Sequence, residues 1–508
     1  MKVKRTLKIR ISNKRRNTAK HFTFDLAHFR NLLVIFQNKY YEYFKQVVLN
    51  ESVIYSLMVD KTTARKSNKQ LEALEELSER INQYPELREI IKAMKKQKIR
   101  VDNNYTLQTT IRHVIKDYKS FIAALKEYYA NPSKFRAPPK PPSPRKLDKI
   151  SHFSTEFNQN SFEITDNTLF LKLRIKGGQN IKIKLPKDAK DITSVRLIYN
   201  LFDVWVDVIY EKELEIAENE SDYVAAIDIR LNNLISLVSS NPNLKSLIIS
   251  GREIKSFNHW FNKKNAKLQS EIDKLNNRIA KEDNELVSND LSNKLSELRF
   301  YFGGLHNYRD RWIDSHFHKL TRMLADYLYE TGHKKLYIGK GAIESKNGIN
   351  LGKITNQNFM SVPFRRLIDM LKYKVEEFGI ELKEIDEQYT SKASSISDNI
   401  LEIQEIYIKN RKNKEKININ LSGRKNSKGL YKDKILNKVF NEGLNSALNI
   451  LKLGAKLHKL ILDLKTVIIK LCNPVKFSVY DFVYHLTSKA ESLLKIGNSW
   501  RHFDAGIA

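Results

Sequence analysis

The chain has 508 residues and a formal net charge of +31, since 89 Lys and Arg outnumber 58 Asp and Glu. Such an excess costs self-repulsion unless a polyanion neutralises it, so a nucleic acid is the default partner. A single cysteine, Cys472, excludes an intrachain disulfide and a CxxC zinc knuckle. The sequence has no signal peptide and no apolar run of spanning length, so we expect a soluble cytoplasmic protein of about two to four domains with no membrane partner.

The N-terminus is strongly basic, with nine Lys or Arg and no acid in residues 1–20. Basic and apolar residues alternate over Val3–Ile11, which predicts a half-exposed strand with a basic face. Four cations of this strand are expected to contact phosphates: Lys4, Arg5, Lys8 and Arg10.

The next segments predict a helical insertion within a β unit. From Leu26 to Tyr129 the apolar residues recur at helical spacing. Residues Asn131–Arg145 are rich in Pro and cations, which excludes a helix interior and predicts an extended linker. Short alternating segments then predict an antiparallel β unit, at 169–175, 181–185, 195–199 and 204–210.

The second half predicts an α/β core. Ala225–Val238 and Lys335–Ile338 are typical of buried strands. Between them, Leu268 to Ile279 and Leu291 to Leu298 carry apolar stripes at spacings of three and four, which favours a self-packing helical hairpin over a dimerising coiled coil. Two further helices are predicted near the C-terminus, at 451–469 and 479–494.

Six motifs follow one another in this half. They are VAAIDIRLNNL at 224–234, YRDRWIDSHFHKLTR at 308–322, IGK with INLGKITNQNFMSVP within 336–363, EQYTSKAS at 387–394, LSGRKNSKGLY at 421–431 and FNEGLNSALNI at 440–450. Each is weak alone, but the ordered set is specific. In this order they resemble the transposon-encoded TnpB nucleases, the forebears of type V CRISPR effectors.

The resemblance implies a multidomain α/β fold, with an RNase H-like RuvC core and a β-barrel wedge domain that carries an α-helical recognition insertion. The implied wedge is 1–20 with 131–222, the recognition lobe is 21–130 and the RuvC-like domain is 223–508. The last would contain a helical hairpin at 262–300, a zinc-less insertion at about 405–437 and a C-terminal helical extension at 451–508. In that family the wedge and lobe hold the guide RNA scaffold and the guide–target duplex.

The resemblance also assigns the active-site positions. Cleavage by two Mg²⁺ ions needs converging carboxylates, and the family pattern gives Asp228 as the first and Glu387 as the second, since the usual strand-end position here is Gly339. The third position is Gly443, which has no ligand atom. Its neighbour Glu442 is expected to point elsewhere.

Arg230 is a second obstacle to metal binding. Residues i and i+2 of a strand share a face, so this guanidinium should pair with the Asp228 carboxylate and repel an ion. We therefore expect no catalytic metal or cofactor, with Mg²⁺ required only if cleavage is retained. A further set of residues is expected to contact nucleic acid: Arg309, Arg311, His318, Lys319, Arg322 and Lys392.

The leading hypothesis is a nuclease-dead, RNA-guided and sequence-specific DNA-binding protein that acts in transcription, in the prokaryotic cytoplasm at the nucleoid. Its partners would be a guide RNA, double-stranded target DNA and RNA polymerase or a sigma factor. One alternative is an active RNA-guided endonuclease that uses Asp228, Glu387 and Glu442. Another is a structural guide-RNA-binding protein. The aromatic segment 471–508 either docks onto the core or contacts a transcription protein.

Overall fold

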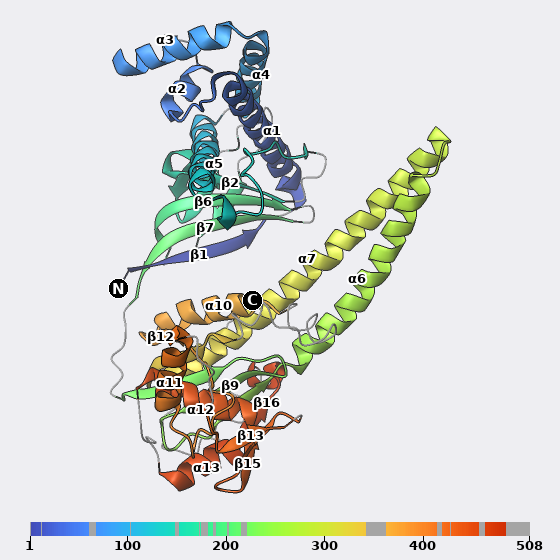
Figure 1. The fold of residues 1–508 in the computed structure, drawn as a ribbon. Helices are drawn as coiled ribbons and strands as arrows, with labels where there is room; N and C mark the ends of the chain where they lie inside the picture. The colour runs from blue at the N-terminus through green and yellow to red at the C-terminus, as the bar shows by residue number, and fades with distance from the viewer. Residues whose placement is uncertain are drawn as a thin grey trace. The chain divides into compact units, whose positions relative to one another are not determined.

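The computed structural model describes residues 2–11, 13–59, 68–101, 103–147, 152–171, 173, 181–185, 189–200, 203–214, 221–341, 362–413, 419–426, 428–456 and 463–483. The chain forms two compact units, Met1–Leu214 and Glu215–Ala508 (Figure 1). Among the described residues, no helix is long and apolar enough to cross a bilayer.

The N-terminal unit contains a four-stranded antiparallel sheet with the order β1-β7-β6-β2. A separate three-stranded sheet has the order β3-β4-β5. These strands are β1 (Lys2–Arg10), β2 (His152–Phe157), β3 (Phe162–Thr165), β4 (Thr168–Leu171), β5 (Ile181–Lys184), β6 (Lys190–Asn200) and β7 (Val204–Glu213). The antiparallel β unit is confirmed.

The predicted β-barrel is not found, because both sheets are open within the described part of the chain. The physical reason is that helices, rather than further strands, cover the apolar face of the larger sheet. Helices α1 and α5 pack against this sheet. Their buried side chains include Phe22, Phe29 and Tyr118, which share one core with Phe157 of β2.

In its described residues, the predicted helical insertion contains five helices (Figure 1). They are α1 (Asn13–Phe44), α2 (Glu51–Ser56), α3 (Asn68–Asn82), α4 (Pro85–Val101) and α5 (Asn104–Ala130). The Pro-rich segment after α5 is extended apart from one 3-10 turn at Pro132–Lys134. The Asn31 Nδ2 group donates to the Arg145 carbonyl at 2.6 Å, which fastens this segment to α1.

The second unit is built on a six-stranded mixed sheet with the order β12-β11-β8-β9-β10-β16. Strands β8, β9 and β10 run antiparallel, whereas β11 and β12 run parallel to β8, and β16 runs parallel to β10. Their bounds are β8 (Tyr223–Asp228), β9 (Asn233–Ser239), β10 (Leu247–Ser250), β11 (His333–Gly339), β12 (Glu381–Ile385) and β16 (Val475–Phe477).

Helices cover both faces of this sheet, which explains why its central strands are continuously apolar. Ala225 and Ile227 share a core with α7 (Glu285–Glu330) and α10 (Phe364–Glu376) on one face. On the other face Ala226 packs with α12 (Glu442–Gly454) and α13 (Leu464–Cys472). Strand β8 therefore lies between two layers of helices, and its last residue is Asp228.

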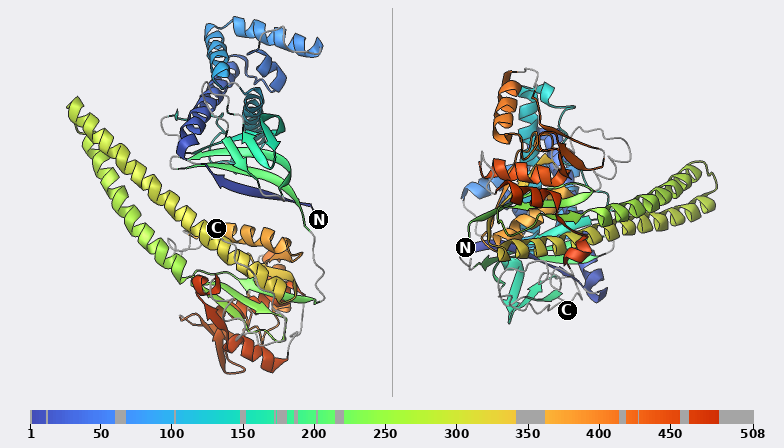
Figure 2. Two further views of the ribbon diagram at one scale, coloured as in Figure 1. Left: turned by 180° about the vertical axis from the view of Figure 1, so that it is seen from behind. Right: turned by 90° about the horizontal axis from the view of Figure 1, so that it is seen from below.

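The predicted helical hairpin is confirmed and is longer than expected. Helix α6 (Arg252–Ile279) lies side by side with α7, and both extend away from the sheet (Figure 2). Ile272 of α6 and Leu291 and Leu295 of α7 are buried between them. The two stripes thus pack against each other within one chain.

The C-terminal part agrees with the predicted helices only in part. In place of the single helix predicted at 451–469, α12 ends at Gly454 and α13 begins at Leu464, and Val475–Phe477 joins the sheet as a strand. Of the helix predicted at 479–494, the described residues 479–483 are helical. Phe482 is fully buried in the core of the unit, so residues 475–483 dock onto that core. Residues 484–508, with Tyr484 and Trp500, lie outside the described residues. The insertion near 405–437 contains the end of α11 (Ile400–Asn413) and two strands of a small sheet formed by β13 (Gly423–Lys425), β14 (Leu430–Asp433) and β15 (Lys438–Asn441).

Candidate active site

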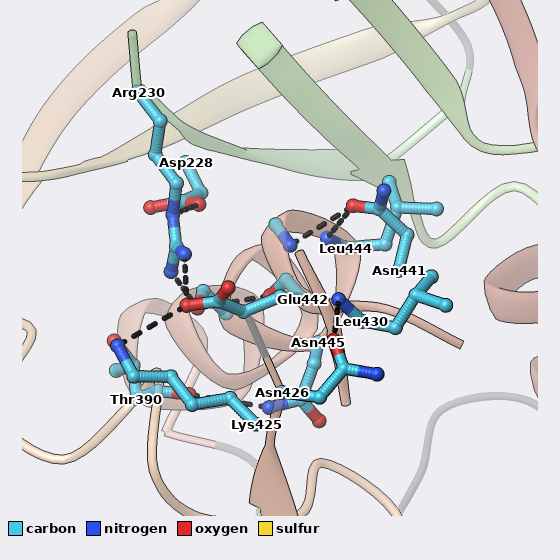
Figure 3. A network of polar contacts seen from close by, with 12 residues as sticks. Asp228, Arg230, Thr390, Lys425, Asn426, Leu430, Asn441, Glu442, Leu444 and Asn445 are labelled. Carbon is cyan, nitrogen blue, oxygen red and sulfur yellow. Dashed lines mark hydrogen bonds and ion pairs between the residues drawn. The ribbon is translucent and has the colours of Figure 1, made fainter. Parts of the chain in front are cut away.

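The site lies where β8 ends and α12 begins. Asp228 is the last residue of β8 and pairs in register with Ser236 of β9. Asn441 caps α12, because its Oδ1 atom accepts hydrogen bonds from Gly443 N at 2.9 Å and Leu444 N at 3.2 Å (Figure 3). This cap fixes the first turn of α12, and with it Glu442 and Gly443.

Arg230 joins the two elements. Its Nε group donates to the Asp228 Oδ2 atom at 2.6 Å, which is the expected pair. Its Nη1 group donates to Glu442 Oε1, and its Nη2 group donates to Ser446 Oγ at 2.7 Å. Figure 3 shows the guanidinium between the two carboxylates. The expectation that Glu442 points elsewhere is therefore wrong, because the first turn of α12 directs its side chain to Arg230.

The two carboxylates of this ion network are buried, whereas Arg230 is partly exposed. The exposed fraction is 3% for Asp228 and 9% for Glu442, and Lys425 Nζ lies 3.3 Å from Glu442 Oε1. Burial raises the pKa of Asp228, and the Arg230 guanidinium opposes that rise. Burial by itself would lower the pKa of Arg230, but Asp228 and Glu442 raise it above its ordinary value, so the guanidinium stays charged.

Glu387 follows β12, and its carboxylate lies over the end of β11, the strand next to β8. A Cβ atom built at Gly339 would lie 1.6 Å from Glu387 Oε2, and one built at Gly341 would lie 1.6 Å from Glu387 Oε1. The Glu387 carboxylate thus fills the volume above both glycines. A carboxylate from a later segment stands where a side chain of position 339 would otherwise be.

The surroundings of Gly443 leave no free space for a side chain at this position. A Cβ atom built at this residue would lie 2.3 Å from Ser236 Oγ and 3.0 Å from Ser236 Cβ. Both residues are buried. Ser236 therefore occupies the start of the path that a side chain at 443 would take.

Hydrogen bonds connect α12 to the EQYTSKAS segment. Asn445 Oδ1 accepts from Ser395 N at 2.8 Å, and Asn445 Nδ2 donates to Ala393 O at 2.8 Å. One turn later, Asn449 Nδ2 donates to Thr390 O at 2.9 Å. The i, i+4 spacing of the two asparagines in the last motif is the sequence signal for this contact, which sequence reasoning missed.

Two segments of the chain match known families. Residues 207–343 match the family OrfB_IS605, described as a probable transposase, and residues 364–450 match the Cas12f1-like TNB domain. The chain is a TnpB-like protein.

One curated relative is the TnpB-like protein ORF457 of Acidianus two-tailed virus, which is 28% identical over 251 residues. The match covers 47% of this chain and 44% of that protein, so it spans less than half the length of the relative.

Two solved complexes align with most of the chain at low identity. A Cas12f1–sgRNA–target DNA complex is 14% identical, with 90% of this chain and 100% of that chain covered and a TM-score of 0.29. A CRISPR–Cas12f ternary complex is 12% identical, with 85% and 81% covered and a TM-score of 0.31. At these scores the superpositions support no structural assignment.

The side chains of this TnpB-like site do not fit a pair of Mg²⁺ ions. Asp228 and Glu442 are both engaged by Arg230, and position 443 has no donor atom. Within the described ranges, no three His, Cys, Asp or Glu side chains are grouped as metal ligands. A guanidinium instead supplies the positive charge between the carboxylates.

The expected basic helix lies within α7. Some of its cations pack against other side chains of the second unit, and others are exposed. Arg309 lies in the seam between α6 and α7, with its Nε group 3.1 Å from Asn258 Oδ1 and its guanidinium 5.0 Å from the Phe261 ring. Arg322 contacts Glu377 at 2.5 Å. Arg309 and Arg322 thus have packing and ion-pair roles.

The other expected contacts of the TnpB-like second unit lie nearer the surface. Arg311, His318 and Lys319 are exposed on α7. Lys392 is also exposed, and its Nζ atom lies 5.1 Å from the Tyr389 ring centre. These four remain proposed phosphate contacts.

Strand β1 has the predicted alternation, but its basic face meets acids. Lys4, Lys8 and Arg10 are exposed, whereas Arg5 lies on the opposite, half-buried face. In the antiparallel register Lys4 is opposite Glu211 and Lys8 is opposite Asp207, and Arg10 forms an ion pair with buried Asp203. Phosphates at Lys4 and Lys8 must therefore compete with the carboxylates of β7.

Proposed function

We propose that this TnpB-like protein is an RNA-guided, sequence-specific DNA-binding protein that does not cleave its target. The observation that carries the proposal is the engagement of Asp228 and Glu442 by Arg230, next to a glycine at position 443. Hydrolysis by two metal ions needs the carboxylates that these contacts occupy.

The proposed core is RNase H-like and RuvC-like. The order of the sheet supports this inference, since three antiparallel strands, β10-β9-β8, continue into two parallel strands, β11 and β12. Asp228 then stands at the end of β8, and the Glu387 carboxylate lies over the end of the adjacent strand β11, where the family has its carboxylates. We infer that the N-terminal unit supplies the wedge and recognition parts, without a closed barrel among its described strands.

The proposed partners are a guide RNA and double-stranded DNA. The net charge of +31 supports binding of a polyanion, and the similar Cas12f1 complex contains an sgRNA and target DNA. In such a system base pairing reads the sequence, and the protein recognises backbone shape and a short flanking motif. The guide RNA is then required, whereas Mg²⁺ is not a catalytic cofactor.

A protein that binds DNA by pairing and does not cut it is suited to control transcription. The guide–target duplex is held by contacts to its backbone and forms an obstacle or a platform on the gene. We propose that the bound complex blocks RNA polymerase or recruits an initiation factor, such as a sigma factor, in the prokaryotic cytoplasm.

A second candidate is an active endonuclease, and the position of Glu442 favours it. Its carboxylate reaches the Asp228 site, so Asp228, Glu387 and Glu442 could form a ligand set if Arg230 moved away. Charge-assisted hydrogen bonds to both carboxylates and a third bond to Ser446 oppose that movement.

Footprinting of the complex on DNA with a matched guide tests the binding function. We expect protection of the target only with the matched guide, and its loss when the segment next to the flanking motif is mismatched. A reporter with the target in its promoter should change expression in parallel. Guide RNA binding without any protected DNA would support the structural RNA-binding alternative and contradict the proposal.

A further inference from the structure

A column of aromatic rings lies at the base of the α6–α7 hairpin, outside the candidate active site. The rings of Phe257 and Trp312 stack with their centres 4.0 Å apart and their planes at 9°. Trp312 also stacks on His316 at 4.6 Å, and His316 Nε2 lies 2.9 Å from Glu253 Oε2. Packing between the two helices accounts for this inner part of the column and holds it in place.

The outer end of the column has a different character. Trp260 lies 5.5 Å and Tyr308 lies 5.9 Å from the Phe257 ring centre, and their own planes meet at 72°. Trp260 is 41% exposed and Tyr308 is 48% exposed. These two exposed rings meet edge to face, with their centres 6.1 Å apart, and we call the pair the aromatic patch. Together with the Phe257 ring they form a contiguous apolar surface, which is the kind of surface that binds partners.

Both helices carry cations near the aromatic patch. Residues 252–267 of α6 contain five Lys or Arg and a single acid, Glu253, which faces His316. Lys263 and Lys264 lie three and four residues after Trp260, so they share its side of the helix. On α7, exposed Arg311 lies three residues after Tyr308. The surface thus combines flat rings with positive charge.

This combination selects among possible partners. The cations favour a polyanion over an apolar protein surface. Exposed rings bind bases whose faces are free, which excludes the interior of a duplex. A strand displaced from DNA offers consecutive unpaired bases, whereas many bases of a folded guide are paired.

We propose that the aromatic patch of Trp260 and Tyr308 is a stacking site for bases of single-stranded DNA. The occupant is the strand displaced when the guide pairs with its target, and this assignment of the source rests on the proposed function. Phe257 and Trp312 support the two outer rings, and Lys263, Lys264 and Arg311 contact the backbone of the strand. Such a site would slow re-annealing and prolong the bound state.

The test compares two oligonucleotides on the full-length protein without guide, a thymidine strand and an abasic strand of the same length. Both carry the same phosphates, so their affinity ratio isolates the contribution of the bases. We expect Trp260→Ala with Tyr308→Ala to reduce this ratio about tenfold or more. Trp260→Phe with Tyr308→Phe should keep most of it. The matched control is Phe300→Ala with Tyr301→Ala, which removes two exposed rings of α7 outside the aromatic patch.

Two outcomes would overturn the stacking site. They are an unchanged affinity ratio in the Ala variant and an equal loss in the control variant. The measurement needs no guided pairing. Base-dependent binding that requires Trp260 and Tyr308, together with absence of guided DNA protection, would support the site and contradict only the proposed function.

Discussion

The Arg230 guanidinium donates a 2.6 Å hydrogen bond to the Asp228 carboxylate two residues earlier. The positive charge next to this carboxylate therefore comes from a side chain of the protein. The same guanidinium reaches Glu442 and Ser446 on the first turns of α12. It therefore connects the central strand of the sheet to the helix that carries the last family motif.

We expect Arg230→Met to lower the free energy of unfolding of the second unit by about 3–5 kcal/mol, because the buried Asp228 and Glu442 carboxylates lose their partner. Urea unfolding of the full-length protein measures this change. Arg424→Met is the matched control, since Arg424 is exposed on β13, and it should change the free energy by less than about 0.5 kcal/mol. Equal effects of the two substitutions would contradict a buried ion network.

The wild-type thermal midpoint should not respond to Mg²⁺, since Arg230 occupies the carboxylates. Arg230→Gly removes the cation and leaves space between Asp228 and Glu442, so Mg²⁺ should raise the midpoint of this variant by binding the folded state. Adding Asp228→Asn should remove the response. A wild-type midpoint that rises with Mg²⁺ and falls with chelator would mean that Arg230 does not exclude the ion.

Restoring the missing carboxylate requires more than one substitution. Gly443→Asp alone should destabilise the protein and yield no cleavage, because its Cβ atom meets Ser236 Oγ at 2.3 Å and Arg230 stays in place. The triple variant Gly443→Asp, Arg230→Gly and Ser236→Gly has the best prospect of activity. Nicking of guide-matched DNA with Mg²⁺ measures it, and cleavage by Gly443→Asp alone would contradict the roles given to Arg230 and Ser236.

The basic face of β1 is tested by the salt dependence of guide RNA binding. Replacement of Lys4 and Lys8 by Ala should reduce the slope of log K against log salt by about two units, one for each lost phosphate contact. The control removes the same charge from exposed positions on α5, with Lys116→Ala and Lys119→Ala. If the slope stays the same, Lys4 and Lys8 serve only as cross-strand partners of the acids on β7.

His333 predicts a loss of stability in acid. Burial lowers its pKa from 6.5 to about 4, and its ring nitrogens lie 2.6 Å from Ser239 Oγ and 2.9 Å from Thr331 Oγ1. The unfolded chain binds the proton more readily, so the contribution is complete above pH 6.5 and is lost as the pH falls towards 4, up to roughly 3 kcal/mol. The difference in urea midpoint between wild type and His333→Gln should therefore shrink over this range. His259→Gln, at an exposed site on α6, should leave the pH profile unchanged.

The sequence predicts those features that depend on local pattern. The alternation over Val3–Ile11 predicts a strand, and the stripes of Leu268 to Ile279 predict a hairpin, because period alone determines which face is buried. The spacing of Asp228 and Arg230 likewise predicts their pairing. Each of these inferences involves residues close together in the chain.

Features that depend on register or on helix start positions were not predictable. The clash of a Cβ atom at position 443 with Ser236 can be foreseen only from two facts. One is the register of β8 against β9, and the other is the residue at which α12 begins. The motif does not show that Asn441 caps the helix, and this cap sets the direction of the Glu442 side chain. The sequence alone therefore predicts, wrongly, that Glu442 points away from Asp228. The open sheet of the N-terminal unit depends on which helices cover it, which strand patterns do not reveal.

Quantitative cleavage on a supercoiled plasmid tests the central claim most directly. The protein is loaded with a matched guide, and the same sample is measured for occupancy of the target and for nicked and linear DNA in the presence of Mg²⁺. We predict full occupancy with no nicking above that of an Asp228→Asn variant. Nicking or linearisation that requires the matched guide and Mg²⁺, and that Asp228→Asn abolishes, would contradict the account.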